Sequence, residues 1–230
     1  MQRRLGALGF DAGRVDGIFG PDTQAALLDF QRNAGLTTDA VCGRTTLEVL
    51  DRLSGRTTEQ PVADVRERER LRNSPPTLHG RRIIIGDLGG AAALAQAVRR
   101  ELSGSGAFAV VVPHPDPSAQ AVQANGVGAD AYLGLVTASA GCSTAFYAGH
   151  GYESPGGRRL AECVEGEVPA VLGTPTAAPT GMAVPVLRET RMPAVLCELG
   201  PPAVVVERGG ALAQAFARAF TRWVEGLSDV

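Results

Sequence analysis

The stretch that decides the fold class is Arg82-Ile83-Ile84-Ile85-Gly86-Asp87-Leu88-Gly89-Gly90, which leads into the alanine-rich segment 91–102. Three consecutive isoleucines form a short apolar run that is typical of a strand buried on both faces. The glycines after them indicate a loop, and Leu94, Val98 and Leu102 then recur at the spacing of one helix face. The sequence therefore predicts a strand at 82–85, a loop at 86–90 and a helix at 91–102.

The same alternation of strands and helices continues along the rest of the chain. Apolar runs predict strands at 108–112, 131–136, 143–147 and 194–197, and amphipathic patterns predict helices at 118–127, 158–168 and 211–227. This alternation favours an α/β domain over residues 80–230, with a mixed, largely parallel sheet flanked by helices. Residues 54–79 alternate acids and bases between loop-like segments, so we expect a charged linker with a solvated helix at 62–72.

An internal repeat organises the first part of the chain. Asp16-Gly17-Ile18-Phe19-Gly20-Pro21-Asp22-Thr23 recurs as Asp39-Ala40-Val41-Cys42-Gly43-Arg44-Thr45-Thr46. Each copy has the pattern of a turn followed by a helix start, where Pro21 suits the first position and Asp22 or Thr45 can cap or charge the helix. Together with a short helix at 2–8, the repeat predicts a small all-α three-helix domain over residues 1–53.

Composition excludes several classes of function. The 230 residues carry 22 basic and 24 acidic side chains, so there is no basic field for a nucleic acid. All 22 basic residues are arginine, which excludes a Schiff-base lysine or a P-loop lysine in this chain. No apolar run reaches the ~18 residues of a membrane span, and the first residues are too polar for a signal peptide. We therefore expect a cytoplasmic protein that neither spans a membrane nor binds nucleic acid.

Residues 5–50 resemble the peptidoglycan-binding domain of the three-helix type. The resemblance rests on the D-G-x-F-G-x-x-T core at 16–23, on Phe30-Gln31 after it, and on the second copy of the repeat. It implies a groove beside the repeat that contacts glycan or peptide. The ligand-binding residues it implies are Asp16, Gly17, Phe19, Gly20 and Asp39. The alternative is that Phe19 and Phe30 only fill the core.

Residues 80–227 resemble the zinc-dependent N-acetylmuramoyl-L-alanine amidases of the cell wall, through segments 82–85, 124–130 and 192–198. Segments 124–130 and 190–193 are similar in particular to the actinobacterial amidase-like regulators of peptidoglycan synthesis. The resemblance implies a zinc ion held by two histidines and a glutamate, with a further glutamate as general base.

The metal-ligand positions of these amidases hold no ligands in this chain. Leu88 and Val136 occupy the two histidine positions, and the helix start at 91–95 offers no carboxylate. Apolar side chains cannot bind a divalent cation, so we predict no metal and no cofactor. Glu198 alone matches the family, at the general-base position. The alternative for Glu198 is a structural carboxylate paired with Arg188 or Arg191.

The three histidines of the chain, His79, His114 and His150, lie outside the ligand positions, and we expect them on the surface or in turns. A relocated zinc site that uses His114, His150 and Glu198 is an alternative. We predict a non-catalytic pseudo-amidase that regulates cell-wall synthesis, with peptidoglycan fragments or precursors and cell-wall synthesis proteins as its partners. The alternative function is an active zinc-dependent amidase that hydrolyses the bond between muramic acid and the stem peptide.

Overall fold

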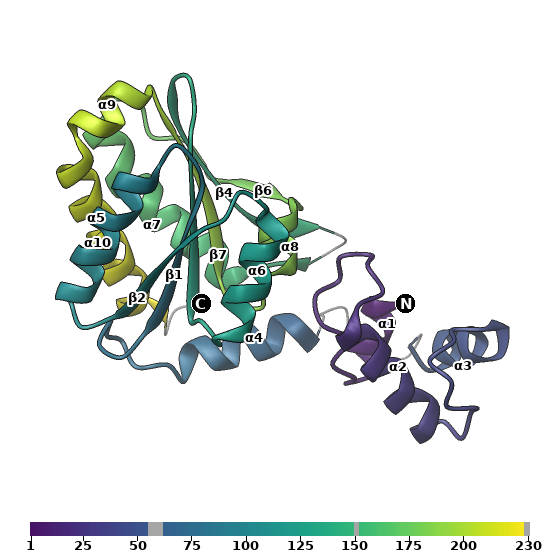
Figure 1. The fold of residues 1–230 in the computed structure, drawn as a ribbon. Helices are drawn as coiled ribbons and strands as arrows, with labels where there is room; N and C mark the ends of the chain where they lie inside the picture. Colours follow the sequence, from purple (N-terminus) through teal and green to yellow (C-terminus); the bar gives the residue numbers. More distant parts are fainter. Residues whose placement is uncertain (55–61, 150–151, 228–230) are drawn as a thin grey trace. The chain divides into compact units, whose positions relative to one another are not determined.

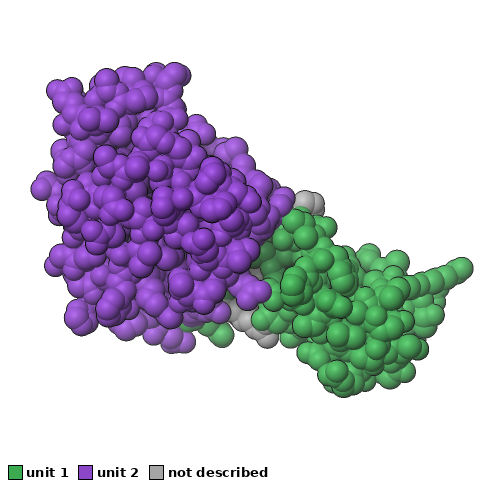
Figure 2. All heavy atoms as spheres, viewed as in Figure 1, with its two compact units in different colours: residues 1–69, 149–152 green, residues 70–148, 153–230 purple. Residues whose placement is uncertain are grey.

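The computed structural model describes residues 1–54, 62–149 and 152–227. The chain forms two compact units (Figure 2): unit 1 comprises residues 1–69 with 149–152, and unit 2 comprises residues 70–148 with 153–230. Helices build unit 1, whereas unit 2 contains a sheet with helices on both faces (Figure 1). Within the described residues, no helix is both long and apolar enough to cross a membrane.

Helices α1 (Gln2–Ala7), α2 (Pro21–Asn33) and α3 (Arg44–Ser54) of unit 1 pack around a small apolar core. Phe30 is buried at the centre of this core, and Phe10 packs edge-on against it with ring centroids 5.5 Å apart. Helix α2 begins with Pro21 in its first turn, as the repeat predicts. Gly20 is the N-cap and no side chain caps this helix, so Asp22 does not cap it; Asp22 does place a negative charge in the first turn, the other role that we expected.

Helix α4 (Val62–Arg72) occupies the segment that we expected to be a solvated linker helix. Glu69, Arg70 and Arg72 are exposed at the end of this helix, as expected, but Leu71 is 3% exposed and belongs to the core of unit 2. Arg81, which is also buried, donates hydrogen bonds to the carbonyl oxygens of Pro75 and Thr77. These contacts fix the chain directly before the first strand of the sheet.

The strands of the sheet are β1 (Arg82–Gly89), β2 (Phe108–Pro113), β3 (Ala131–Thr137), β4 (Gly141–Gly149), β5 (Tyr152–Glu153), β6 (Thr180–Met182) and β7 (Ala194–Gly200). They lie in the order β2-β1-β3-β7-β4-β5, with β6 beside β4. Strand β1 is parallel to β2 and β3, and β3 is parallel to β7, whereas β4 is antiparallel to β7. The expected mixed, largely parallel sheet is confirmed.

Helices cover both faces of this sheet (Figure 1). Helices α5 (Ala92–Gly104), α7 (Pro155–Leu172) and α10 (Gly209–Glu225) lie on one face. Helices α6 (Pro117–Gly126) and α8 (Pro185–Glu189) lie on the other, and α9 (Pro202–Glu207) packs at the end of β7. The short elements α8, α9, β5 and β6 were not predicted. Each has too few residues to show a period in the sequence.

Successive side chains along each strand point to opposite faces of the sheet. One face places Leu133, Leu135, Val195 and Cys197 in the main core, against the three long helices. The opposite face carries Tyr132, Gly134 and Leu196, and it becomes more exposed toward the carboxyl ends of the strands. The candidate site lies on this second face.

Candidate functional site

The carboxyl ends of β1, β3 and β7 bring together the three positions that the sequence singled out. Val136 of β3 is the register partner of Glu198 of β7, and Gly89 of β1 is the partner of Val136 on the other side. The β1–β3 register shifts between Asp87 and Gly89, so Leu88 is the extra residue of a bulge. The loop expected at 86–90 is therefore mostly strand, and Leu88 lies within β1.

Leu88 turns its side chain toward Gly134 on the neighbouring strand. A Cβ atom at Gly134 would lie 3.2 Å from Leu88 Cδ1 and 3.1 Å from Leu196 Cδ1. The two leucines thus meet over Gly134 and fill the space in front of it. With Val136 next along β3, they make an apolar floor at this end of the sheet, all three of them partly buried.

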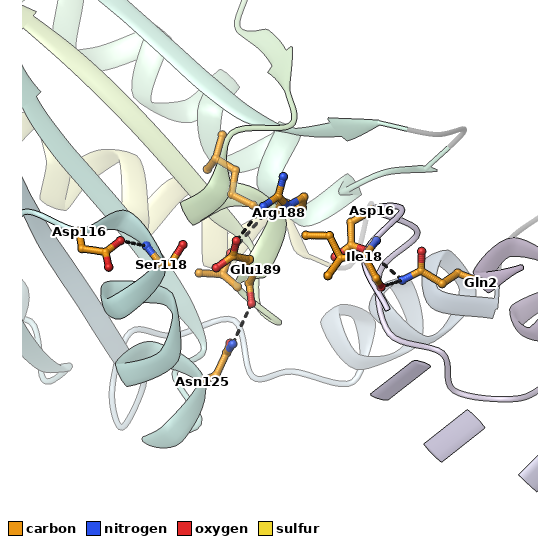
Figure 3. Close-up of polar contacts among 10 residues, drawn as sticks. Gln2, Asp16, Ile18, Asp116, Ser118, Asn125, Arg188 and Glu189 are labelled. Atoms are coloured by element: carbon orange, nitrogen blue, oxygen red, sulfur yellow. Dashed lines mark hydrogen bonds and ion pairs between the residues drawn. The ribbon is translucent and has the colours of Figure 1, made fainter. Parts of the chain in front are cut away.

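Glu198 is exposed at the edge of this apolar floor. Its register partner on β4 is Ser143, whose Oγ lies 3.4 Å from Glu198 Oε2. The pairing with Arg188 that we considered is not present in the described structure, because Arg188 contacts Glu189 at 2.8 Å instead (Figure 3). Glu198 is therefore an exposed carboxylate in polar contact with the neighbouring strand.

The chain that follows β1 is folded tightly against β3. Asp87 Oδ1 accepts hydrogen bonds from the backbone N–H groups of Gly89 and Ala91, at 3.0 and 3.1 Å. Thr137 Oγ1 donates to the carbonyl oxygen of Gly89, and a Cβ atom at Gly90 would overlap this threonine. These hydrogen bonds and the close packing at Gly90 hold the β1–α5 connection against the end of β3.

A buried polar network supports this end of the sheet from the second face. Gln120 of α6 accepts a hydrogen bond from the Tyr132 hydroxyl and donates to the carbonyl oxygens of Asp87 and His114. Burial raises the pKa of Tyr132 well above its ordinary value, so its hydroxyl stays protonated and remains a donor. Farther along α6, Asn125 bonds the backbone of Glu189 and Arg191 and ties α6 to the end of α8 (Figure 3).

The residues at this site do not fit a zinc ion. Leu88 and Val136 offer no lone pair to a metal, and Leu88 already packs against Gly134 and Leu196. Throughout residues 1–54, 62–149 and 152–227, no three His, Cys, Asp or Glu side chains are grouped so that they could hold a metal ion. Among Leu88, Val136 and Glu198, Glu198 is the one residue whose side chain carries an oxygen that could bind a metal or accept a proton.

The described histidines and Cys142 lie in turns or in packed parts of the fold. His114 Nδ1 accepts a hydrogen bond from the N–H of Asp116, which makes it a turn residue, and His79 packs against Gly106. His150 lies outside the described residues, so the relocated zinc site cannot be traced there. Burial, with a smaller contribution from the nearby Glu165 charge, raises the pKa of the Cys142 thiol to about 12. A thiol with this pKa is not an activated nucleophile.

In unit 1, a buried glutamine holds each copy of the repeated loop. Gln2 Nε2 donates to Asp16 Oδ1 at 2.8 Å and to the carbonyl oxygen of Ile18, while its Oε1 accepts from the N–H of Gly17 (Figure 3). In the second copy, Gln31 makes the equivalent bonds, to Asp39 Oδ1 at 2.8 Å, to the carbonyl oxygen of Val41, and from the N–H of Ala40. The two loops are therefore built in the same way around Gln2 and Gln31.

These contacts separate the expected ligand-binding residues into two groups. The Asp16 and Asp39 carboxylates each accept a hydrogen bond within their own loop, from the N–H two residues on, and a second bond from the glutamine. The bond from the Val41 N–H, followed by that from Gln31, lowers the pKa of Asp39 below its ordinary value of 3.8. Both carboxylates shape their loops. Phe19 is different, because it is 50% exposed, whereas Phe30 is 1% exposed and fills the core.

Ala40 is strained in the second loop. It has a φ of 59°, whereas glycine, Gly17, occupies the equivalent position of the first loop with a φ of 79°. An L-residue with a side chain pays roughly 1–2 kcal/mol for this conformation, partly offset by the greater freedom of glycine in the unfolded chain. We expect Ala40→Gly to stabilise unit 1 by about 0.5–1 kcal/mol, and Gly17→Ala to destabilise it by about 1 kcal/mol. Amide hydrogen exchange of α2 in the full chain measures both changes, and equal effects of the two substitutions would contradict the expectation.

Comparisons with known proteins agree with these two parts of the chain. Residues 1–50 match a family described as "Putative peptidoglycan binding domain". The chain is 34% identical over 231 residues to the N-acetylmuramoyl-L-alanine amidase CwlM of Mycobacterium tuberculosis, an alignment that covers 87% of this chain. The chain spans 57% of the length of that relative.

Solved structures show the fold of the second part. An N-acetylmuramoyl-L-alanine amidase of Clostridium difficile 630 superposes with a TM-score of 0.56 at 16% identity, covering 64% of this chain and 98% of that one. The amidase Ami1 of Mycobacterium smegmatis gives a TM-score of 0.55 at 13% identity, over 64% of this chain and 98% of that one. The chain therefore joins a domain of the peptidoglycan-binding family to a domain with the fold of N-acetylmuramoyl-L-alanine amidases.

Several residues that shape the two sites were not singled out in the sequence. Asp87, Thr137 and Ser143 act across strands, so only their register neighbours explain them. Asp87 had one local signal, since an aspartate two residues before a glycine pair is typical of a side-chain-supported turn. Gln31 was quoted only as part of the Phe30-Gln31 pair that carries the resemblance, without a role of its own, and Gln2 had no signal. The two glutamines lie at different distances from the loops that they hold.

Proposed function

We propose that this protein is a non-catalytic amidase-fold protein that binds peptidoglycan or its precursors and regulates cell-wall synthesis. The observation that supports the proposal is the apolar floor of Leu88, Val136 and Leu196, because the resemblance implies zinc-binding histidines at the positions of Leu88 and Val136. A protein that binds such a ligand without cleaving it acts through binding alone. Regulation through a protein partner in cell-wall synthesis is the role that follows.

Metal content and turnover test the absence of catalysis. We expect purified protein incubated with zinc and then desalted to retain far less than one zinc per chain, and to release no stem peptide from muramyl peptides. Glu198→Gln should behave like the wild type, because without a metal Glu198 has no activated water to deprotonate. An active amidase assayed in parallel shows that the assay works. Stoichiometric zinc, together with turnover that Glu198→Gln abolishes, would contradict the proposal.

Stoichiometric zinc with turnover would instead support the alternative function, an active zinc-dependent amidase. One observation favours the alternative: Glu198, which the resemblance implies as the general base, is the register partner of Val136 on β7. The alternative needs ligands other than Leu88 and Val136, such as those of the relocated site with His114, His150 and Glu198. Metal analysis separates the two functions before any assay of turnover.

Ligand binding by unit 1 is the second half of the proposal, and the exposed ring of Phe19 supports it. An aromatic ring on the surface can pack against the apolar face of a sugar or a peptide side chain, which is worth about 0.5–1.5 kcal/mol. Titration of the full chain with a muramyl peptide is expected to show binding that Phe19→Ala weakens about tenfold. Leu53→Ala, which changes a side chain of similar exposure on α3, is the matched control. Equal affinities of the wild type and Phe19→Ala would remove Phe19 from the site.

A further inference from the structure

Strand β2 forms an outer edge of the sheet in unit 2, next to β1 (Figure 1). The N–H of Phe108 donates to the carbonyl oxygen of Arg81, so Phe108 directs its backbone groups toward β1. In a parallel pair the direction alternates along the strand, so Ala109 and Val111 direct their N–H and C=O groups away from the sheet. Among the described residues, no strand pairs with this side of β2.

This edge lacks the features that usually protect an edge strand. Residues 107–113 contain no charged side chain, and the first proline is Pro113, at the very end of β2. Phe108 is 67% exposed and Val110 is 52% exposed, on the same face of the strand. Val127 is also exposed, and its carbonyl oxygen accepts a hydrogen bond from Arg82, the register neighbour of Phe108. An apolar, uncharged edge with free backbone groups is a template for another strand.

We propose that β2 pairs with β2 of a second copy of this chain, antiparallel and across a two-fold axis at Val110. In this register Ala109 faces Val111 of the second copy, and both residues direct their backbone groups outward. The two symmetry-related pairs are therefore hydrogen-bonded pairs, each exchanging two bonds. The hydrogen bonds between the two copies stop beyond these pairs, because Pro113 has no N–H and the N–H of Ala107 is already bonded to Leu102.

The side chains favour a second copy as the occupant of this edge. The axis places Val110 directly opposite Val110 of the second copy, in a non-hydrogen-bonded pair where side chains are closest. Phe108 lies opposite Val112 of the second copy, which is already buried, and diagonal to the exposed Val110 of the second copy, which an aromatic ring can reach; each exposed ring therefore gains Val110 as an apolar neighbour. Because residues 107–113 carry no charge, self-pairing brings no like charges together along the strand.

The buried area sets the expected strength of this dimer. Covering Phe108, Val110 and the edge backbone in both copies removes on the order of 700 Å² from solvent, below the 1,200 Å² of a standard stable interface. We therefore expect a weak and reversible dimer. The pairing uses no residue of the apolar floor or of the repeated loops, so it is independent of the proposed function.

Sedimentation equilibrium of the full chain, from about 10 µM to about 1 mM, tests the proposal. We expect a monomer–dimer equilibrium that Val110→Lys weakens at least tenfold, because the axis opposes two lysines. Val110→Glu should do the same. An equal mixture of the two variants should recover dimerisation, since lysine then faces glutamate. This recovery would identify Val110 as the residue on the axis. If the variants only lost apolar surface, mixing them would not restore dimerisation.

Val122→Lys is the matched control, because Val122 is 69% exposed on α6 and lies outside β2. It should dimerise like the wild type. Circular dichroism of each variant checks that the exposed substitutions leave the fold intact. A chain that stays monomeric at the highest concentration overturns the proposal and leaves the edge for an extended segment of a different protein. A dimer that Val110→Lys leaves unchanged overturns it as well, because the interface then lies elsewhere.

Discussion

Replacing Gly86 with alanine is expected to destabilise unit 2 by about 3 kcal/mol. Gly86 lies in β1 directly over the buried pair of Gln120 and Tyr132, and a Cβ atom there would overlap Gln120 Oε1 and the Tyr132 hydroxyl. Neither side chain can simply move away, because Gln120 also bonds the carbonyl oxygens of Asp87 and His114. The substitution therefore forces overpacking and breaks buried hydrogen bonds together.

Urea unfolding followed by tryptophan fluorescence measures this change in unit 2 alone. The chain has a single tryptophan, Trp223, which is fully buried in α10 and bonded to the carbonyl oxygen of Gly156. Gly104→Ala is the matched control, because nothing lies within 4 Å of its Cβ position at the end of α5. It should be neutral or stabilising by up to about 1 kcal/mol. Equal midpoints for the two variants would show that Gly86 is not held against the Gln120–Tyr132 pair.

The fold class of unit 2 could be predicted because its strands and helices show their own hydrophobic patterns in the sequence. The isoleucines of β1 and the helical spacing of Leu94, Val98 and Leu102 predict a strand and a helix, and the structure contains both. The end of β1 was not open to prediction. Gly86 and Asp87 have low strand propensity, and they stay in the strand because β2 and β3 pair with them on both sides.

The candidate site shows the same division between local and distant information. Leu88, Val136 and Glu198 were singled out from motifs, and the strand register places Val136 beside Glu198. The bulge at Leu88 was not predicted, because a bulge is set by the pairing of two strands rather than by one of them. The bond between Ser143 and Glu198 likewise joins strands whose order the sequence does not specify.

The repeat in unit 1 shows a further limit of prediction from sequence. Copies of the loop are visible because their residues recur at a constant offset, from Asp16 to Asp39 and from Thr23 to Thr46. The glutamines that hold them do not follow this offset, since Gln2 is 14 residues before Asp16 and Gln31 is 8 residues before Asp39. A search for repeated sequence therefore finds the loops and misses what fixes their shape.

Replacing Gln31 with leucine is accordingly expected to destabilise unit 1 by about 3 kcal/mol and to release the second loop. Gln31 is 0% exposed, and its amide accepts from the N–H groups of Asp39 and Ala40 and donates to Asp39 Oδ1 and the Val41 carbonyl oxygen. Leucine has nearly the same size but satisfies none of these groups. Each group left without a partner in the folded unit costs on the order of 1 kcal/mol or more.

Hydrogen exchange of the full chain resolves this effect by position. Amides of α2 and α3 should exchange faster in Gln31→Leu, while the urea midpoint reported by Trp223 in unit 2 stays at its wild-type value. Gln24→Leu is the matched control, since it makes the same substitution on the exposed side of the same helix and should change neither measurement. If Gln24→Leu and Gln31→Leu lose the same protection, the loss comes from a new apolar side chain rather than from the amide. Only a loss confined to Gln31→Leu makes this glutamine the residue that shapes the loop.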